Sequence, residues 1–283
     1  MRTLILGANG MLGHALVRVF GADAIPWDRD DLDITDAAAV TKKLGELRPD
    51  VVINAAAYTA VDKAESEPDI AMKVNGEAVS YLARACKALA IPLLHISTDY
   101  VFEGNQPGGY TEDAVPDSSK ILNVYGRSKR RGEELLEKSG ASSWLVRTAW
   151  LYGPHGKNFV ATILGLAETK PELRVVADQH GSPTYTDDLA KAIHALIRDK
   201  ASYGTYHLVN DGIATWADLA AEACKIAEIT TTIIRIPATE YPLPARRPEW
   251  SVLRNTKRPP LRPWKEAVRD YVQSLRTSDT LIS

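Results

Sequence analysis

The stretch TLILGANGMLGHALVRVF, residues 3–20, decides the fold class that we expect for this chain. A short apolar strand runs directly into a glycine-spaced turn, and the turn opens a segment whose apolar residues recur at helical spacing. One glycine makes the tight bend, one lets a diphosphate approach the backbone, and one lets helix and strand pack closely. The helix N-terminus adds N–H groups and a positive partial charge. Glycines alone could serve the turn only, but their position between strand and helix predicts dinucleotide binding by Gly7, Gly10, Met11, Leu12 and Gly13.

Strands and helices alternate through the first half of the chain. After the opening unit we expect strands at 24–27, 51–54, 92–97 and 144–147, with helices at 36–47, 69–89 and around residue 125. Such alternation predicts an α/β protein with a Rossmann-type doubly wound parallel sheet covered by helices on both faces. Residues 103–120 are rich in Gly, Pro, Asp and Ser and are expected to form a surface loop beside the site.

The second half mixes helices with short strands. We expect helices at 159–168, 187–198 and 216–228 and strands at 206–209 and 232–236, and proline becomes frequent from residue 237 onward. We therefore predict a dinucleotide-binding Rossmann domain over residues 1–150. Residues 151–283 are predicted to form mainly a smaller C-terminal substrate-binding lobe, partly interleaved with the first domain.

Tyr125 and Lys129 are four residues apart in the run NVYGRSK, so on a helix their side chains share one face. A phenol normally titrates near pH ~10, and a neighbouring ammonium favours the phenolate and lowers that pKa. Such a tyrosine can give a proton to a ketone oxygen while hydride reaches the carbon. An ordinary solvated helix pair is the alternative, and the glycine turn at the start of the chain argues against it.

The glycine spacing followed by Tyr-x-x-x-Lys resembles the extended short-chain dehydrogenase/reductase family. Within it, several intervening runs resemble the dTDP-4-dehydrorhamnose reductases: NAAAYTAVDKAE (54–65), STDYVF (97–102), RTAWLYG (147–153), DQHGSPT (178–184) and RRP (246–248). The resemblance covers residues 2 to about 260 in the same order. It implies NAD(P)H-dependent reduction of the C4 keto group of a nucleotide-linked deoxysugar, dTDP-4-dehydro-L-rhamnose to dTDP-L-rhamnose, with Tyr125 as proton donor and Lys129 also holding the nicotinamide ribose.

The same resemblance places a third catalytic residue after the strand that ends near residue 97, where a doubly wound sheet binds its ligands. It implies that the Thr98 hydroxyl hydrogen-bonds the substrate oxygen, with Ser97 as the competitor, and that Asp99 also meets the substrate. Related dehydratases carry a glutamate two residues after that threonine, and Tyr100 in its place argues against dehydration.

Further substrate contacts are expected from segments later in the chain. Trp150 matches a family position that packs against the sugar, although it could be a core residue. Asn158 and Phe159 open a helix and are expected near the nucleotide. Arg246 or Arg247, in a proline-rich loop, could pair with the diphosphate, and we take Arg246 as the candidate.

Two regions are expected to hold the rest of the cofactor, either NADPH or NADH. Carboxylates after the second strand, Asp28 and Asp33, can bind ribose hydroxyls and would repel a 2′-phosphate, whereas Arg29 could accept that phosphate. Ile34 follows in the same segment. By resemblance, a second region after the strand at 51–54 also lines the cofactor: Ala57, Tyr58 and Thr59.

The composition of the chain limits the kinds of partner that we expect. The 283 residues carry a net charge of −2, which gives no sign of nucleic-acid or membrane binding, and no apolar segment approaches the ~20 residues that span a bilayer. Cys86 and Cys224 are expected to be buried thiols, and we expect a cytoplasmic protein. The six histidines lack ligand spacing, so no metal is predicted. Some relatives dimerise through magnesium held by acidic residues, but here that stretch is His14-Ala15, so a monomer or a metal-independent homodimer is expected.

Two alternatives to this function stay open. The first is another sugar-nucleotide reductase or an epimerase. The second is a non-catalytic regulatory subunit that binds the dinucleotide and acts through another enzyme, and the Thr98, Tyr125 and Lys129 set argues against it.

Overall fold

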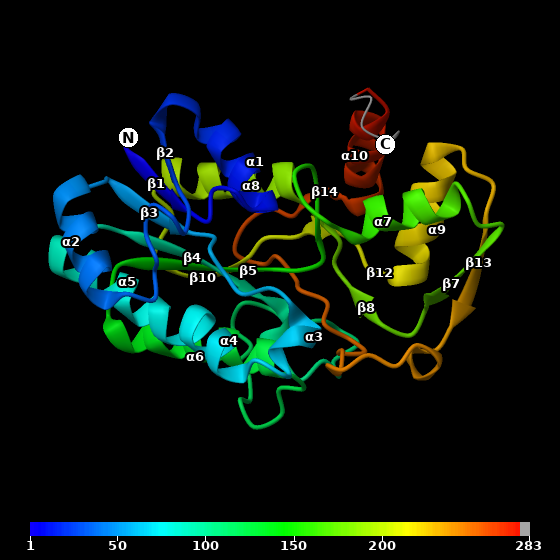
Figure 1. Cartoon of the computed structure of the whole chain (residues 1–283), viewed down its shortest axis with the longest axis horizontal. Coiled ribbons are helices and arrows are strands. Elements are labelled where there is room, and N and C mark those ends of the chain that lie inside the picture. The colour runs from blue at the N-terminus through cyan, green and yellow to red at the C-terminus, as the bar shows by residue number, and fades with distance from the viewer. Residues whose placement is uncertain (278–283) are drawn as a thin grey trace.

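A six-stranded parallel sheet organises the larger lobe of the computed structural model, which describes residues 1–277 (Figure 1). Every neighbouring pair is parallel, so the carboxyl ends of all six strands lie at one edge. The spatial order is β10 (Gly204–His207), β5 (Ser143–Thr148), β4 (Leu93–Thr98), β3 (Val51–Asn54), β1 (Thr3–Leu6) and β2 (Ala24–Trp27). The predicted Rossmann-type fold class is confirmed.

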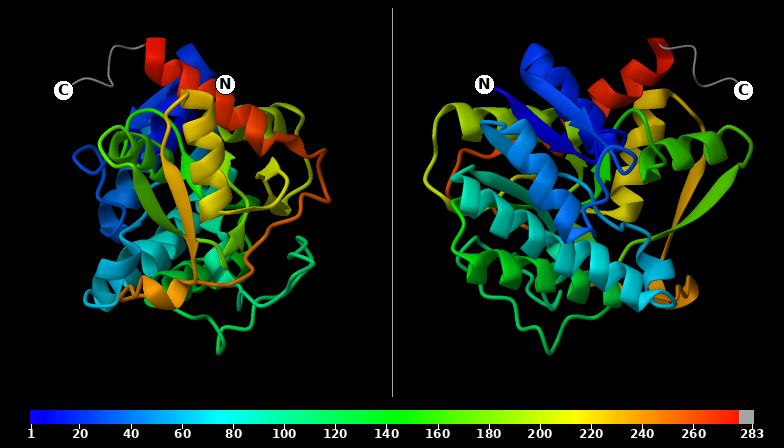
Figure 2. Two further views of the ribbon diagram at one scale, coloured as in Figure 1. Left: turned by 90° about the vertical axis from the view of Figure 1, so that its right-hand side faces the viewer. Right: turned by 60° about the vertical axis from the view of Figure 1, so that its left-hand side comes forward.

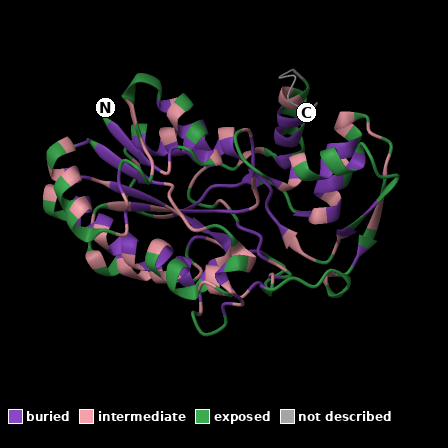
Figure 3. Cartoon of the chain, in the orientation of Figure 1, coloured by how far each residue is buried: buried purple, intermediate pink, exposed green. Residues whose placement is uncertain are grey.

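Helices cover both faces of this sheet (Figures 1 and 2). One face carries α1 (Met11–Phe20) and α8 (Thr186–Arg198), which pack against each other. The other carries α2 (Ala37–Leu47), α5 (Ala78–Leu89) and α6 (Val124–Ser139). Because the inner strands are covered on both sides, β1 and β3 consist entirely of buried residues, which appear purple in Figure 3.

The edge strands differ from the inner strands. Pro26 lies in β2 at the edge of the sheet, where a residue without an N–H is tolerated. At the other edge, β10 comes from the second half of the chain, as does α8 on the α1 face. The two halves of the sequence are therefore interleaved in the large sheet.

The expected helix at 69–89 is interrupted. It consists of α4 (Pro68–Met72), a π-helical turn η2 (Lys73–Glu77) and α5. Such turns concentrate at functional sites, and Asn75 in this one is hydrogen-bonded to Tyr58 in the loop after β3. A short helix α3 (Val61–Ala64) precedes it.

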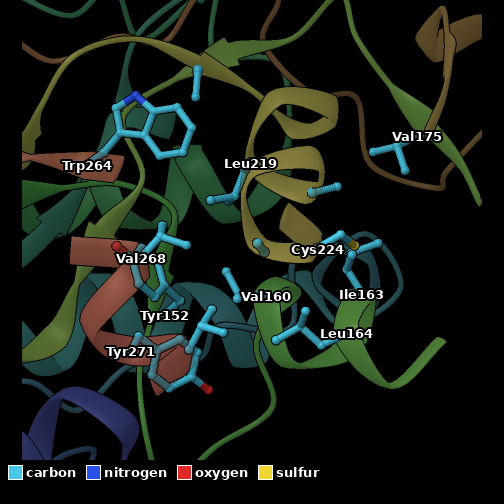
Figure 4. Packing of buried hydrophobic residues seen from close by; sticks show 14 of the residues in the cluster. Tyr152, Val160, Ile163, Leu164, Val175, Leu219, Cys224, Trp264, Val268 and Tyr271 are labelled. Carbon is cyan, nitrogen blue, oxygen red and sulfur yellow. The ribbon is translucent and has the colours of Figure 1, made fainter. Parts of the chain in front are cut away.

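The smaller lobe contains three helices and a two-stranded parallel sheet. Its elements are α7 (Phe159–Ala167), α9 (Trp216–Ala227), α10 (Trp264–Thr277), β7 (Glu172–Val176) and β13 (Thr232–Ile236). Two of the helices, α7 and α9, lie against the sheet, and the third, α10, packs on α9. Tyr152, Leu219, Val268 and Tyr271 belong to the core shown in Figure 4, and Cys224 is a buried free thiol within it. The sequence patterns did not predict β7 or α10. They also missed the remaining short strands: β6 (Leu151–Tyr152), β8 (His180–Gly181), β9 (Thr184–Tyr185), β11 (Asn210–Asp211), β12 (Ala214–Thr215) and β14 (Leu261–Pro263).

An irregular segment, residues 247–254, joins the two lobes. Its Trp250 N–H donates to the Gly104 carbonyl, its Ser251 N–H donates to the His180 carbonyl, and its Arg254 N–H donates to the Tyr110 carbonyl. The segment therefore touches both the loop after β4 and strand β8 of the smaller lobe, and it brings Arg247 and Ser251 to the carboxyl edge of the large sheet.

Candidate active site

The glycine turn between β1 and α1 is tightly packed where the fold needs it and open where a ligand would sit. Gly7 has φ +79°, and a Cβ there would lie 2.7 Å from the Ala56 nitrogen. A Cβ on Gly13 would lie 2.1 Å from the Gly7 carbonyl oxygen. At Gly10 the nearest neighbour would be that same oxygen at 3.3 Å. No side chain caps α1, so the first N–H groups of the helix, including those of Met11 and Leu12, remain available for an anion.

The two candidate carboxylates after β2 are already hydrogen-bonded. Asp28 accepts from the Asn9 N–H at 2.9 Å and from the Arg29 N–H at 2.7 Å, so it holds the glycine turn in place. Asp33 accepts from the hydroxyl and N–H of Thr35, and these bonds lower its pKa. Ile34, next to Asp33, is buried. Asp28 thus has a structural role as well as the proposed ribose contact.

The loop after β3 is linked by hydrogen bonds to α6, the helix that carries Tyr125. This loop contains three of the predicted cofactor contacts, Ala57, Tyr58 and Thr59. Asn75 from the π-helical turn accepts from the Tyr58 N–H at 2.8 Å and donates to the Tyr58 carbonyl at 2.9 Å. Its amide also donates to the Ser128 hydroxyl on α6 at 3.0 Å. Sequence reasoning missed Asn75, and its only signal was a polar amide beside glycine inside a helical pattern.

Helix α6 begins unusually close to the end of β4. Asn123 caps it by accepting from the Gly126 N–H at 2.7 Å, and Glu65 accepts from the Val124 N–H at 2.8 Å. A Cβ on Gly126 would lie 2.2 Å from the Tyr100 carbonyl oxygen, so only glycine permits this approach. The result places the rings of Tyr125 and Tyr100 edge to face, with centroids 5.9 Å apart.

Thr98 and Asp99 meet Tyr125 at this edge of the sheet. The Thr98 hydroxyl donates to Asp99 Oδ1 at 2.9 Å and is also hydrogen-bonded with Tyr125. Asp99 Oδ2 accepts from the Ser251 hydroxyl at 2.5 Å. Asp99 was predicted to meet the substrate, but it is only 2% exposed and both its oxygens are occupied, so in this structure it orients Thr98 instead.

Burial, rather than Lys129, dominates the acidity of Tyr125. Burial raises the pKa of Tyr125 to about 12. The predicted lowering by the Lys129 ammonium is therefore wrong for this structure. Lys129 Nζ instead donates to the Ile96 carbonyl at 2.7 Å and lies 3.5 Å from His95 Nε2. Burial lowers the pKa of Lys129 to about 8, opposed by the charge of Glu133.

Ser97, the competitor of Thr98, faces a buried ion pair instead. Its hydroxyl donates to Glu133 Oε1 at 2.6 Å, and Arg147 from β5 donates to both oxygens of Glu133 at 2.8 Å. Arg147 holds the pKa of Glu133 below its usual value despite its burial. Ser97 thus lies beneath the site, and the geometry favours Thr98.

Trp150 and Asn158 lie in the smaller lobe. Trp150 has a left-handed backbone (φ +47°), and its ring stacks on that of Trp216 at 3.5 Å between centroids. Phe159 packs against the same Trp216, a residue that sequence reasoning missed. Asn158 caps α7 by accepting from the Ala161 N–H, and its amide donates to the Tyr271 hydroxyl at 2.8 Å. Asn158 thus caps the helix, and its nucleotide contact stays a prediction.

The two arginines of the RRP run have different environments. Arg247 forms a bidentate ion pair with Asp62, with Nη1–Oδ1 at 2.5 Å and Nη2–Oδ2 at 2.7 Å. Arg246 is exposed, and its side chain makes no ion pair in the part of the chain that the structure describes. Of the two, Arg246 is the arginine whose side chain is exposed.

Two findings concern other kinds of site. Within residues 1–277, no three His, Cys, Asp or Glu side chains are grouped so as to hold a metal ion. Over the same residues, no helix combines the length and apolar character needed to cross a membrane.

A glycine turn at the first strand of a Rossmann sheet, with Thr98, Tyr125 and Lys129 at its carboxyl edge, defines a dinucleotide-dependent reductase of the short-chain dehydrogenase/reductase class. A family model described as RmlD substrate binding domain matches residues 1–277. The dTDP-4-dehydrorhamnose reductase of Streptomyces griseus is 44% identical over 289 residues, which cover 97% of this chain and 94% of that protein.

Two solved structures are similar over nearly the whole chain. A dTDP-4-dehydrorhamnose reductase from Clostridium acetobutylicum has a TM-score of 0.93 and 40% identity, covering 98% of this chain and 100% of its own. One from Bacillus anthracis strain Ames, in complex with NADP, has a TM-score of 0.92 and 36% identity, covering 96% of this chain and 99% of its own. The chain belongs to the family of dTDP-4-dehydrorhamnose reductases that the RmlD model describes.

The open position of Gly10 allows a test of dinucleotide binding. We predict that Gly10→Val folds, because its new side chain meets little besides the Gly7 carbonyl, yet binds NADPH at least about tenfold more weakly, a loss of ~1.4 kcal/mol. Cofactor fluorescence titration measures this. Gly45→Val in α2, where a Cβ has no neighbour within 4 Å, is the control. Equal affinity in a folded Gly10→Val protein would make the turn purely structural.

Asp99 gives a pH prediction. Burial raises its pKa from 3.8 to about 6, so the folded protein holds this proton more tightly than the unfolded chain does. Stability attached to Asp99 is therefore greatest at acidic pH and decreases as pH rises through about 6. Relative to the parent, Asp99→Asn should gain stability between about pH 4 and pH 7.5, by at most ~3 kcal/mol. Urea unfolding at both pH values measures the gain. If the free energy of unfolding of Asp99→Asn differed from that of the parent by the same amount at both pH values, the raised pKa of Asp99 would be refuted.

Proposed function

We propose that this protein catalyses NAD(P)H-dependent reduction of the C4 keto group of a nucleotide-linked deoxysugar, and specifically of dTDP-4-dehydro-L-rhamnose to dTDP-L-rhamnose. The observation that carries the proposal is the contact between Thr98 and Tyr125 at the carboxyl end of β4, with Lys129 one helical turn after Tyr125 and the glycine turn at the same edge of the sheet. The names of the family members support the choice of sugar.

The reduced cofactor supplies hydride to C4 of the sugar when it is bound. Tyr125 then gives its hydroxyl proton to the sugar oxygen. With a pKa of about 12, the phenol is fully protonated at neutral pH and ready to donate. Thr98, fixed by Asp99, holds the Tyr125 hydroxyl in place. Lys129, with a pKa of about 8, then returns a proton to the phenolate.

We assign the cofactor to the glycine turn, the Asp28–Ile34 segment and the loop of Ala57, Tyr58 and Thr59. The NADP bound to the Bacillus anthracis relative supports a nicotinamide dinucleotide. Arg29 is highly exposed, with 84% of its side-chain surface accessible, and makes only a long 3.9 Å ion pair with Asp33, so its guanidinium can turn toward a 2′-phosphate. NADPH or NADH is therefore the proposed reductant.

We assign the nucleotide sugar to the carboxyl edge of the large sheet, on the side of the smaller lobe, with residues 1–150 as the dinucleotide domain and 151–283 as mainly the substrate lobe. Trp150, stacked on Trp216, offers an aromatic surface for the sugar, and Arg246 offers a guanidinium that forms no ion pair within residues 1–277 and could bind the diphosphate. We further propose a cytoplasmic enzyme without a metal cofactor that acts as a monomer or a metal-independent homodimer.

Tyr125→Phe tests the proton donor. Turnover with dTDP-4-dehydro-L-rhamnose should drop by a factor of roughly 100 to 10,000, because the ring remains but the proton donor is lost. NADPH affinity and unfolding temperature should stay close to the parent's. The exposed Tyr203, mutated to Phe, is the control. Turnover within a few-fold of the parent would remove Tyr125 from its role.

The same assay separates the alternatives. A parent protein that oxidises NADPH with another nucleotide 4-keto sugar, but not with this one, would be a related reductase. If the parent protein binds NADPH tightly but does not oxidise it with any of the nucleotide 4-keto sugars tested, the regulatory-subunit alternative is supported.

A further inference from the structure

Lys129 ends a chain of hydrogen bonds that begins on a neighbouring strand. His95, on β4, is fully buried and places its Nε2 atom 3.5 Å from Lys129 Nζ. Its other ring nitrogen, Nδ1, lies 3.1 Å from the Asn54 side-chain nitrogen at the end of β3. Neither residue has a role in the chemistry described above.

The direction of these hydrogen bonds follows from the backbone. The Ala56 N–H donates to Asn54 Oδ1 at 3.2 Å, which fixes the amide so that its NH₂ group faces His95. The Asn54 NH₂ can only donate, so His95 Nδ1 must accept. A neutral imidazole carries one proton, and that proton is then on Nε2, facing Lys129.

His95 is held neutral by its surroundings. Burial lowers its pKa well below the ordinary value, and the nearby positive charge of Lys129 lowers it further. The ring therefore stays a directional neutral group over the working pH range, with one donor and one acceptor.

An Nε2–H aimed at Lys129 Nζ distinguishes the two forms of the lysine. The free amine has a lone pair that accepts this N–H while one of its own hydrogens is donated to the Ile96 carbonyl. The ammonium has no lone pair and meets the N–H as a second donor. We propose that Asn54 and His95 are positioning residues that hold Lys129 and favour its free amine.

The charged and titratable groups around Lys129 also affect its pKa. Glu133 lies one helical turn onward on α6 and favours the ammonium, but Arg147 from β5 neutralises much of its charge. Tyr125 lies one turn back, and Asp99 follows the end of β4. The balance leaves Lys129 able to change its protonation near neutral pH. Resting on the proposed function, this lets the ammonium return a proton to the Tyr125 phenolate and then recover one from solvent.

The tautomer of His95 is directly measurable. Nitrogen-15 NMR of histidine-labelled protein, without cofactor or substrate, should show His95 protonated on Nε2 and unchanged between about pH 6 and pH 8. His207, the other histidine with a fully buried side chain, is an internal control with the opposite tautomer. Its Nδ1 lies 3.1 Å from the Tyr110 carbonyl and its Nε2 lies 3.5 Å from Arg147 Nη1. His207→Gln identifies that signal. His95 protonated on Nδ1, or on both nitrogens, would overturn the proposal.

A second measurement tests the effect on Lys129. Its side-chain carbon signal, identified by its absence in Lys129→Met, should titrate near pH 8 in the parent. Asn54→Asp keeps the acceptor for the Ala56 N–H, but its carboxylate accepts a hydrogen bond from His95 Nδ1 and so moves the ring proton from Nε2 to Nδ1. His95 Nε2 then accepts from the Lys129 ammonium, and the midpoint of the Lys129 titration should rise by about one pH unit or more. In the His95→Phe background the same Asn54→Asp change should raise it much less. An equal rise in both backgrounds would mean that the carboxylate acts by its charge alone.

These outcomes are independent of turnover. A protein with the Nε2–H tautomer that reduces no sugar would leave this proposal intact and remove the proposed function. An active reductase with His95 protonated on Nδ1 would do the reverse.

Discussion

The close approach of helix α6 to the end of β4 is the constraint on which the rest of the site depends. It requires glycine at Gly126, where a Cβ would lie 2.2 Å from the Tyr100 carbonyl oxygen. The packing of the same helix on the π-helical turn η2 likewise requires glycine at Gly132, where a Cβ would lie 2.2 Å from the Asn75 carbonyl oxygen. Asn123 sets where the helix begins. With the helix at this distance, the i, i+4 spacing brings the phenol of Tyr125 to Thr98 and the amine of its partner lysine to His95 on the same strand.

Burial then determines the chemistry more than any single neighbour. It keeps Tyr125 protonated, with a pKa of about 12, and lowers the pKa of Lys129 to about 8. A simple lysine–tyrosine pair in water would differ less from the ordinary values, since the loss of solvation disfavours the charged form of both groups. Asp99 is buried as well. It accepts hydrogen bonds from the hydroxyls of Thr98 and Ser251, and the first of these orients Thr98. Tyr125, Lys129 and Asp99 therefore all have pKa values that burial displaces from the ordinary ones.

Local patterns predicted the parts of this protein that are local. The glycine turn, the strands of the large sheet through Arg147 and the Tyr125–Lys129 helix follow from spacing within short windows, and the structure contains them. The positions of Asp99 and Asn158 could not be predicted, because their partners Ser251 and Tyr271 lie 152 and 113 residues further along the chain. For the same reason, β7 was missed, since it is defined by pairing with β13 rather than by its own five residues.

The measurement that tests the central claim most directly traces the transferred hydrogen. The account predicts that NADPH carrying deuterium at the transferable position of nicotinamide C4 places one deuterium on C4 of the deoxysugar product. It also predicts that the hydroxyl proton comes from the solvent-exchangeable pool through Tyr125. A product without deuterium at C4, or NADPH oxidation that proceeds equally without the sugar, would contradict it.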